Sequence, residues 1–390
     1  MPENARSPEE LWKALQDAAR FDSTVSIDRS LFSKMLRRHI SPIAYAEENL
    51  FGSMLLGEPY ILTGFPSPLR GALESVAKEE AGPAVMQWLG QNGGQDRHRL
   101  YVGPTGVRRD LTLEEIAAKW RANRTRFGVT DLHIRHTDVE DIVDIDPLSA
   151  FNLLNEAGAM AGEQEMFSLV ISSRGQVTDS HSDAPDSTNY CFTGQKLWLA
   201  WDTYEGMKHG LQDVDRIPLA GKAWFDMETW LSLKSARWLL VNEGETLFLP
   251  AHLTHKVITL KRYVGIGGFF IALPNCLRVM SHWVSRVPLW SKRDLHGERD
   301  GLLGDIAQSI RDKILSLSDA PKQERRRWGY DYLNRSAEEF MRSCPPARLR
   351  ELWSDPRFRS VADAIEAPWP LQSKGTASPF PTSGHATLLS

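Results

Sequence analysis

The sequence predicts a mainly β protein, with a barrel or jelly roll at its centre and helices before and after it. Short apolar runs fill the stretch from about residue 166 to 272, and turn residues such as Arg174-Gly175 and Asn242-Glu243-Gly244 separate them. Many short strands at this spacing favour a barrel or jelly roll over alternating β and α units. The expected strands cover residues 167–172, 196–201, 238–241, 246–249, 257–260 and 263–272.

Capping signals locate the elements that precede these strands. Ser7 and Glu10 have the spacing of a capping box, which predicts a helix at the start of the chain. Thr112 and Glu115 form a second box and predict a helix that follows. Between the two helices, residues 58–64 are typical of a short strand that ends at a glycine.

Helical periodicity returns after Asn275. The apolar residues at a spacing of three or four, which share one helix face, are Leu303, Ile306, Ile310, Ile314 and Leu317. The basic run at residues 325–327 is interpreted as a solvated helix face rather than a nuclear signal. From residue 346 we expect an extended tail, and beyond about residue 368 its content of Ser, Pro, Gly and Thr favours disorder.

Composition excludes several classes of protein. Of 390 residues, 42% are hydrophobic and 25% are charged, as in ordinary globular proteins. No stretch approaches the eighteen or so apolar residues of a membrane span, so an integral membrane protein is excluded. The 46 basic and 50 acidic residues give a net charge of −4. We therefore expect neither strong direct binding to nucleic acid nor membrane attachment.

Cysteine usage indicates the compartment. Cys191, Cys276 and Cys344 are too widely spaced for a disulfide framework and include no Cys-x-x-Cys pair for zinc. The N-terminus has no apolar core of a signal peptide. These features predict an intracellular protein, and they do not separate the cytoplasm from the nucleus.

Histidines followed two residues later by an acid are the first chemical signal. Two residues two apart on a strand point to the same face and can share a metal ion. The sequence has three such pairs, beginning at His136, His181 and His296, where chance would give about one or two. His296 lies in a charged, solvent-exposed stretch, and no later strand offers a third ligand to His136. His181 therefore begins the best candidate pair.

A later strand brings back a third ligand. His181 and Asp183 follow one expected strand, and His255 begins another after the segment 243–251. Antiparallel pairing of these strands would close the three side chains around one ion. Two imidazoles and one carboxylate on one face of an octahedral metal are typical of non-haem Fe(II) oxygenases. The alternative is that the three polar residues are unconnected. On this pattern alone, a shared metal site and three unconnected residues are about equally favoured.

The cosubstrate of many such oxygenases, 2-oxoglutarate, needs a cation and a hydroxyl for its far carboxylate. Lys196 stands within an apolar strand, where alternation puts it on the same face as Trp198. A buried lysine must be paired. Thr178, three residues before His181, is a candidate for the hydroxyl. Taken alone, Lys196 reads as an edge-strand lysine that discourages aggregation; beside the three ligands, the cosubstrate role is favoured.

These motifs, in this order, resemble the JmjC oxygenases. The family pattern is a Thr, His-x-Asp/Glu, Gly-x-Lys-x-Trp, and a Gly-to-Pro segment ending in the distal histidine. Here it is matched by Thr178, His181-Ser182-Asp183, Gly194-Gln195-Lys196-Leu197-Trp198, and the segment from Gly244 to His255. The likeness is greatest to the lysine-demethylase branch that carries PHD or CXXC modules in eukaryotes. It covers about residues 55–285.

The resemblance implies a double-stranded β-helix of the cupin type that holds Fe(II). Such an enzyme hydroxylates a C–H bond of a protein side chain or small molecule, with O2 and 2-oxoglutarate as cosubstrates. The implied metal ligands are His181, Asp183 and His255. The implied cofactor-binding residues are Thr178, Lys196, Trp198 and Asn275. It also implies an organisation of a helical segment 1–54, an oxygenase domain 55–285, a helical segment 286–345 and a tail 346–390.

The chain departs from the family pattern at two positions near the site. His252 precedes the distal ligand where the family has Gly-Trp, and it is interpreted as a loop residue, or one that supports a ligand from behind, rather than a fourth ligand. Phe269 stands where the demethylase branch has an asparagine. With three cysteines, neither a PHD finger nor a CXXC module is present. Demethylation of methyl-lysine is therefore the second candidate, and the intact motif set disfavours a silent binding module.

Overall fold

The structure of the protein, a computed structural model, divides into two compact units. The first comprises residues 1–49, 59–150 and 165–270, and the second comprises residues 50–58, 151–164 and 271–390. The predicted domain borders differ from these and stay predictions. The residues that the structure describes are 7–46, 51, 57–102, 106–134, 137–144, 152–155, 167–183, 185–211, 225–285 and 296–367.

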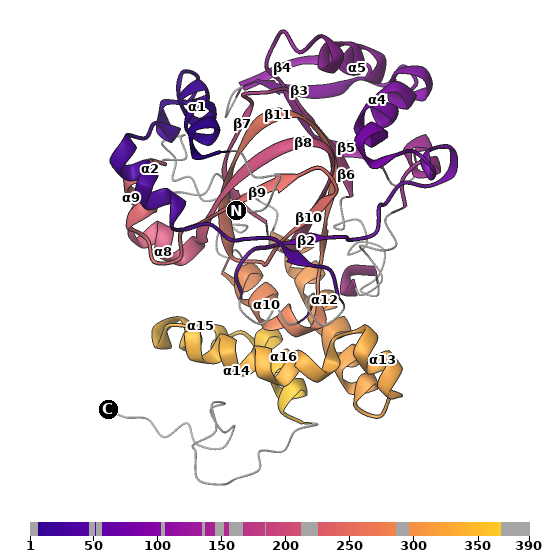
Figure 1. Ribbon diagram of the computed structural model, residues 1–390. Helices are drawn as coiled ribbons and strands as arrows, with labels where there is room; N and C mark the ends of the chain where they lie inside the picture. The colour runs from indigo at the N-terminus through magenta and orange to yellow at the C-terminus, as the bar shows by residue number, and fades with distance from the viewer. Residues whose placement is uncertain are drawn as a thin grey trace. The chain divides into compact units, whose positions relative to one another are not determined.

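A large mixed sheet forms the centre of the first unit (Figure 1). Its order is β1-β2-β10-β8-β11-β6-β5-β3-β4, with β7 beside β11 and β9 beside β8, and among the described residues it does not close into a barrel. The predicted β-rich core is confirmed at this level. The strands are β1 Ile43–Ala44, β2 Tyr60–Thr63, β3 His98–Val102, β4 Gly106–Leu111, β5 Gly128–His133, β6 Ser168–Ser172, β7 Val177–Ser182, β8 Asp186–Asp202, β9 Arg237–Asn242, β10 Glu245–Leu249 and β11 Leu253–Phe270.

Two long strands, β8 and β11, pair along their whole length and organise the sheet. The first half of β11 lies between β7 and the second half of β8, which β9 flanks on its other side. The second half of β11 lies between β6 and the first half of β8, which β10 flanks. Each long strand therefore takes part in two groups of four strands. Gly194, with φ 99°, stands where the two halves of β8 meet.

The sequence predicted most of these strands, and it divided one of them wrongly. The runs at 167–172, 238–241 and 246–249 correspond to β6, β9 and β10, and the run at 196–201 is the second half of β8. The separate strands predicted at 257–260 and 263–272 are one strand, β11. The intervening Lys261 and Arg262 are exposed, and shifts in the register absorb them without ending the strand.

Helices cover one face of the group β7, β11, β8 and β9. Both predicted capping boxes are confirmed, at α1 (Pro8–Ala19) and α5 (Leu113–Ala122). One hydrophobic cluster joins α1, α2 (Arg29–Leu36) and α9 (Met227–Ser232) to these strands, and Figure 1 shows the three helices together. The cluster includes Leu197, Leu199 and Trp201 of β8. The described part of this unit also contains α4 (Ala81–Asn92) and α8 (Thr203–Lys208).

The second unit is helical. Its helices are α10 Cys276–Val284, α12 His296–Ser318, α13 Lys322–Arg327, α14 Leu333–Ser343, α15 Pro346–Ser354 and α16 Pro356–Glu366. The predicted apolar face is confirmed on α12, where Leu303, Ile306, Ile310, Ile314 and Leu317 are buried. Helix α13 buries none of its residues, as expected of a solvated helix face. No helix among the described residues is long and apolar enough to cross a membrane.

The extended tail predicted from residue 346 is wrong for its first part. Residues 346–354 and 356–366 form α15 and α16. Asp355 caps α16 by accepting hydrogen bonds from the backbone N–H groups of Arg357 and Phe358. Apolar residues at helical spacing, among them Phe358 and Ile365, are then buried. The predicted disorder beyond residue 368 lies outside the described residues.

Candidate functional site

A β-bulge decides which side chains share a face at the site. His255 of β11 lies directly opposite His181 of β7, and Val257 lies opposite Thr178. Between these pairs β7 has two residues, Asp179 and Ser180, where β11 has one, so the register shifts. Residues three apart face opposite sides of a regular strand. Because of the bulge, Thr178 and His181 both line one cavity.

The three predicted metal ligands lie together. The ring centroids of His181 and His255 are 4.2 Å apart. His255 Nε2 lies 4.0 Å from Oδ2 of Asp183, which directly follows β7. That separation is too long for a hydrogen bond. Two donors about 2.0–2.2 Å from one ion, as at zinc, are about 3 Å apart when they occupy neighbouring corners of an octahedron, so these two groups must approach each other by about 1 Å to share an ion.

A hydrogen bond fixes the form of the His181 imidazole. His181 Nδ1 lies 2.8 Å from the main-chain carbonyl oxygen of Asp179. A carbonyl oxygen can only accept, so Nδ1 carries the proton and donates. This hydrogen bond leaves Nε2 as the ring nitrogen that can bind a metal ion.

The second imidazole belongs to His255, which is buried. Burial lowers the pKa of His255 well below its ordinary value, and the neighbouring His181 and Lys196 lower it further. A neutral imidazole is the form that binds a metal. The donor set of two imidazoles and one carboxylate suits Fe(II). Among the described residues, no group of three or more His, Cys, Asp or Glu side chains lies close enough together to hold a metal ion as it stands.

The cavity has a volume of about 400 Å³. Its lining includes the three predicted ligands together with Thr178, Lys196 and Trp198. Alternation along β8 is confirmed, because Lys196 and Trp198 face this cavity while their odd-numbered neighbours face the helices. The other lining residues are Gly128, Thr130, Ser168, Val170, Gln176, Val177, Asp179, Ser187, Thr188, Asn189, Leu249, Val257, Gly267, Gly268 and Phe269.

Lys196 is a lysine buried in the wall of the cavity. It is 4% exposed, and its Nζ lies 4.3 Å from the centre of the Tyr263 ring. No carboxylate among the described residues forms an ion pair with it. Burial lowers its pKa from 10.5 to about 7. A carboxylate ligand in the cavity would restore the charge that burial disfavours.

Trp198 completes the group on β8. Its ring centroid lies 5.2 Å from that of His255. Its Nε1 is buried, and no described residue accepts a hydrogen bond from it. A buried N–H group without an acceptor lowers the stability of the folded protein. The cavity therefore offers a cation and a donor on one strand to a ligand that carries oxygen atoms.

Structure adds residues that the sequence pattern did not single out. Tyr263 lies under Lys196, and its hydroxyl donates to Oδ1 of Asn189, which also lines the cavity. Tyr263 begins the predicted strand 263–272, and nothing in that apolar run marks it for the site. Its contact with Lys196 could not be predicted because Lys196 pairs in register with Thr259, not with Tyr263.

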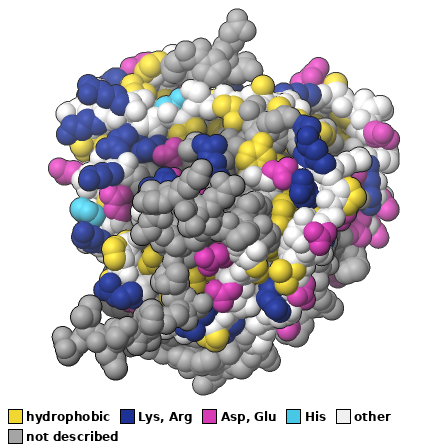
Figure 2. Space-filling model, turned by 90° about the horizontal axis from the view of Figure 1, so that it is seen from below, with side chains coloured by type: hydrophobic (Ala, Val, Ile, Leu, Met, Phe, Trp, Pro, Cys, Tyr) yellow, Lys and Arg dark blue, Asp and Glu magenta, His cyan; other side chains and the backbone are white. Residues whose placement is uncertain are grey.

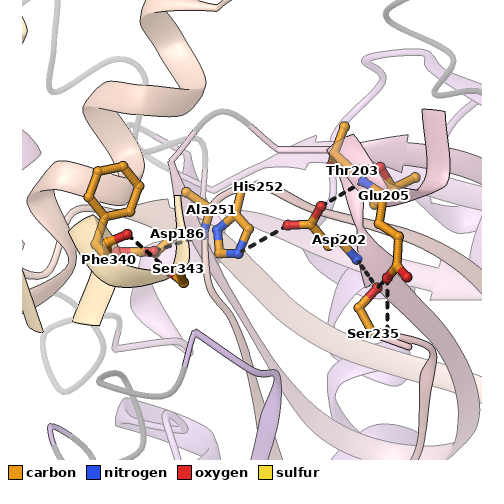
Figure 3. Close-up of polar contacts among 10 residues, drawn as sticks. Asp186, Asp202, Thr203, Glu205, Ser235, Ala251, His252, Phe340 and Ser343 are labelled. Carbon is orange, nitrogen blue, oxygen red and sulfur yellow. Dashed lines mark hydrogen bonds and ion pairs between the residues drawn. The ribbon is translucent and has the colours of Figure 1, made fainter. Parts of the chain in front are cut away.

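His252 lies in the turn that precedes β11, as the loop interpretation expected. Its backbone is left-handed, with φ 73°. Its Nε2 lies 3.9 Å from Oδ2 of Asp202 (Figure 3). Asp202 in turn caps α8 by accepting from the N–H of Glu205. His252 is not among the described residues that line the cavity.

The remaining predicted residues fall elsewhere. Asn275 belongs to the second unit, where it is buried in the short helix Leu273–Asn275, so its role at the cosubstrate stays a prediction. His136 lies outside the described residues. His296 begins α12, and the structure does not describe its side chain.

Comparison with protein-family models and with curated proteins finds no match to the chain.

On the face seen in Figure 2, Lys and Arg side chains are interspersed with Asp and Glu among the described residues. The candidate function therefore depends on the residues of the cavity.

Proposed function

We propose that the protein is an Fe(II)- and 2-oxoglutarate-dependent oxygenase of the JmjC type. The observation that carries this proposal is the pairing of two chemical features in one cavity. One is a set of two imidazoles and a carboxylate, and the other is a buried lysine without a carboxylate partner among the described residues. A keto acid that chelates iron at one end and carries a carboxylate at the other matches both.

The pairing of the strands supports a double-stranded β-helix. In that fold, also called a jelly roll, two four-stranded sheets face each other. The two groups β7-β11-β8-β9 and β6-β11-β8-β10 have the strand order that such a fold requires. We propose that the halves of β8 and β11 belong to opposite sheets.

The side chains take distinct roles in this proposal. His181, Asp183 and His255 would hold the iron. Lys196 and the hydroxyl of Thr178 would hold the far carboxylate of 2-oxoglutarate. When bound, iron and 2-oxoglutarate supply the oxidation, in which O2 and 2-oxoglutarate become succinate and CO2 while a C–H bond of the substrate gains one oxygen atom.

Succinate formation tests this function. We expect purified protein loaded with Fe(II) under exclusion of air to form succinate once 2-oxoglutarate and O2 are added. A panel of methylated peptides, unmodified peptides and small metabolites should include one class that stimulates the reaction. Manganese-loaded protein is the matched control and should form none. Protein that neither binds Fe(II) nor forms succinate would contradict the proposal.

Phe269 bears on the product. It lines the cavity close to Gly267 and Gly268, and a Cβ at Gly268 would meet the ring of Phe167. An aromatic ring at position 269 offers no amide to a methylammonium group, although its face attracts cations. We expect mass spectrometry to show a gain of one oxygen on the substrate. Formaldehyde released in step with succinate from a methylated histone peptide would instead support the demethylase.

A further inference from the structure

A buried ion cluster joins the N-terminal helices to the strands of the site. Lys256 Nζ lies 2.9 Å from Oδ2 of Asp22 and 3.1 Å from Oδ1 of Asp179. The lysine is 1% exposed, and the two carboxylates are 5% and 12% exposed. Asp22 caps the short helix Ser23–Val25, where it accepts from the backbone and hydroxyl of Thr24. The cluster therefore ties three segments of the first unit together.

Two members of the cluster, Lys256 and Asp179, lie close to predicted metal ligands along their strands. Lys256 follows His255 on β11, at the bulge that faces Asp179 and Ser180. Asp179 accepts from the N–H of Ser180 through its side chain, and its main-chain carbonyl accepts from His181 Nδ1. The ion pair with Lys256 thus holds the residue whose carbonyl orients His181. A shift of Asp179 would move that carbonyl and loosen the imidazole.

Stability alone does not explain charges in this place. Burying one lysine and two carboxylates carries a desolvation cost that their attraction often fails to exceed. Apolar residues would fill the same position among α1, α2 and the strands at no such cost. A charged cluster, unlike an apolar contact, fixes direction as well as distance.

We propose that the Asp22–Lys256–Asp179 cluster is a positioning device that holds the β7 bulge and the imidazole of His181. Through Asp22, the N-terminal segment would then contribute to the geometry of the site. The inference rests on the proposed function in taking His181 as a metal ligand. The three residues are proposed to act through His181, so they are positioning residues.

Asp22→Asn is the variant that tests the device. It keeps the shape of the side chain, removes its charge and leaves Lys256 one carboxylate, so the fold survives. Lys256→Met would instead leave two buried carboxylates facing each other. Leu15→Ala is the matched control, because it removes apolar packing from the same N-terminal cluster and none of the charges. Asp22→Glu keeps the charge and should therefore keep most of the wild-type affinity for Mn(II).

Two measurements separate positioning from stability. With Mn(II) alone as the probe, at a temperature where every variant is folded, Asp22→Asn should bind roughly ten-fold more weakly than the wild type. Loss of a group that orients a metal ligand typically lowers metal affinity by roughly ten- to a hundred-fold. The smaller loss is expected here because the Asp179 carbonyl, which contacts His181 directly, remains. Leu15→Ala should lower Tm and leave the Mn(II) affinity unchanged. Equal affinity in Asp22→Asn and the wild type would overturn the proposal, as would an equal loss in both variants.

The second measurement needs no metal. In nitrogen-15 spectra of the metal-free protein, His181 should show a protonated Nδ1 in the wild type and in Leu15→Ala. In Asp22→Asn this proton should exchange faster with solvent. If the wild type binds no Mn(II), the proposed metal site fails, whereas these spectra still decide whether the cluster orients His181. An unchanged His181 signal in Asp22→Asn would overturn the inference.

Discussion

His181→Ala and Asp183→Ala are each expected to lower turnover by about 1000-fold or more while the protein stays folded. A metal ion contributes several kcal/mol of stabilisation to the reaction, and each 1.36 kcal/mol is a factor of ten in rate. Both side chains line the cavity and are not part of the hydrophobic cluster beneath α1 and α2. Circular dichroism should therefore show a folded protein, and iron analysis should show lost metal.

The two histidines at the start of β11 provide an internal control. His255 lies beside His181 of the neighbouring strand β7, whereas His252, in the turn before β11, lies near Asp202 of β8. His255→Ala should lose iron and activity, and His252→Ala should keep both. If His252→Ala loses iron while His255→Ala keeps full occupancy, the assignment of the distal ligand is wrong.

Local rules predicted the elements whose signals lie within a few residues. A capping box needs only residues three apart, and both boxes, at Ser7 and at Thr112, are present in the structure. Alternation needs only a continuous strand, so it placed Lys196 and Trp198 on the face opposite Leu197 and Leu199. In each case the physical cause is contained in the segment itself.

Features that depend on pairing could not be predicted from the sequence. Strict alternation would have placed Thr178 and His181 on opposite faces, and only the bulge opposite Lys256 brings them to one cavity. The partnership of Lys256 with Asp22 joins residues far apart in the sequence, so no local pattern marks it. Of the long strands β8 and β11 the sequence likewise predicted only shorter pieces. In β11 the exposed Lys261 and Arg262 interrupt the apolar run, as turn residues do.

Lys196 is expected to take up a proton when the cavity binds 2-oxoglutarate. Its pKa, lowered by burial to about 7, leaves it mostly neutral at pH 8. A carboxylate beside it favours the charged form and raises that pKa again. Binding at pH 8 should therefore take up nearly one proton, and affinity should fall as the pH rises above about 7. Calorimetry in buffers of different ionisation enthalpy measures this uptake directly.

The same lysine sets the direction of a pH effect on folding. Between pH 7 and 10.5 the unfolded chain binds more protons at this residue than the folded protein, so the free energy of unfolding rises with pH across that window. Below pH 7 the cost of the buried charge is present in full. Lys196→Met should therefore stabilise the unliganded protein most at acidic pH, which urea unfolding at pH 6 and pH 9 would measure.

Lys196→Ala should also weaken the apparent affinity for 2-oxoglutarate by roughly ten- to a hundred-fold. A charge-assisted hydrogen bond to a buried carboxylate contributes about 1.5–3 kcal/mol, and each 1.36 kcal/mol is a factor of ten. Lys261→Ala is the matched control, since this lysine lies on β11 but is exposed. The Michaelis constant for 2-oxoglutarate should rise in Lys196→Ala alone, and proton uptake should vanish with it. An unchanged Michaelis constant in that variant would place the carboxylate elsewhere in the cavity and leave the buried charge of Lys196 without its proposed ligand.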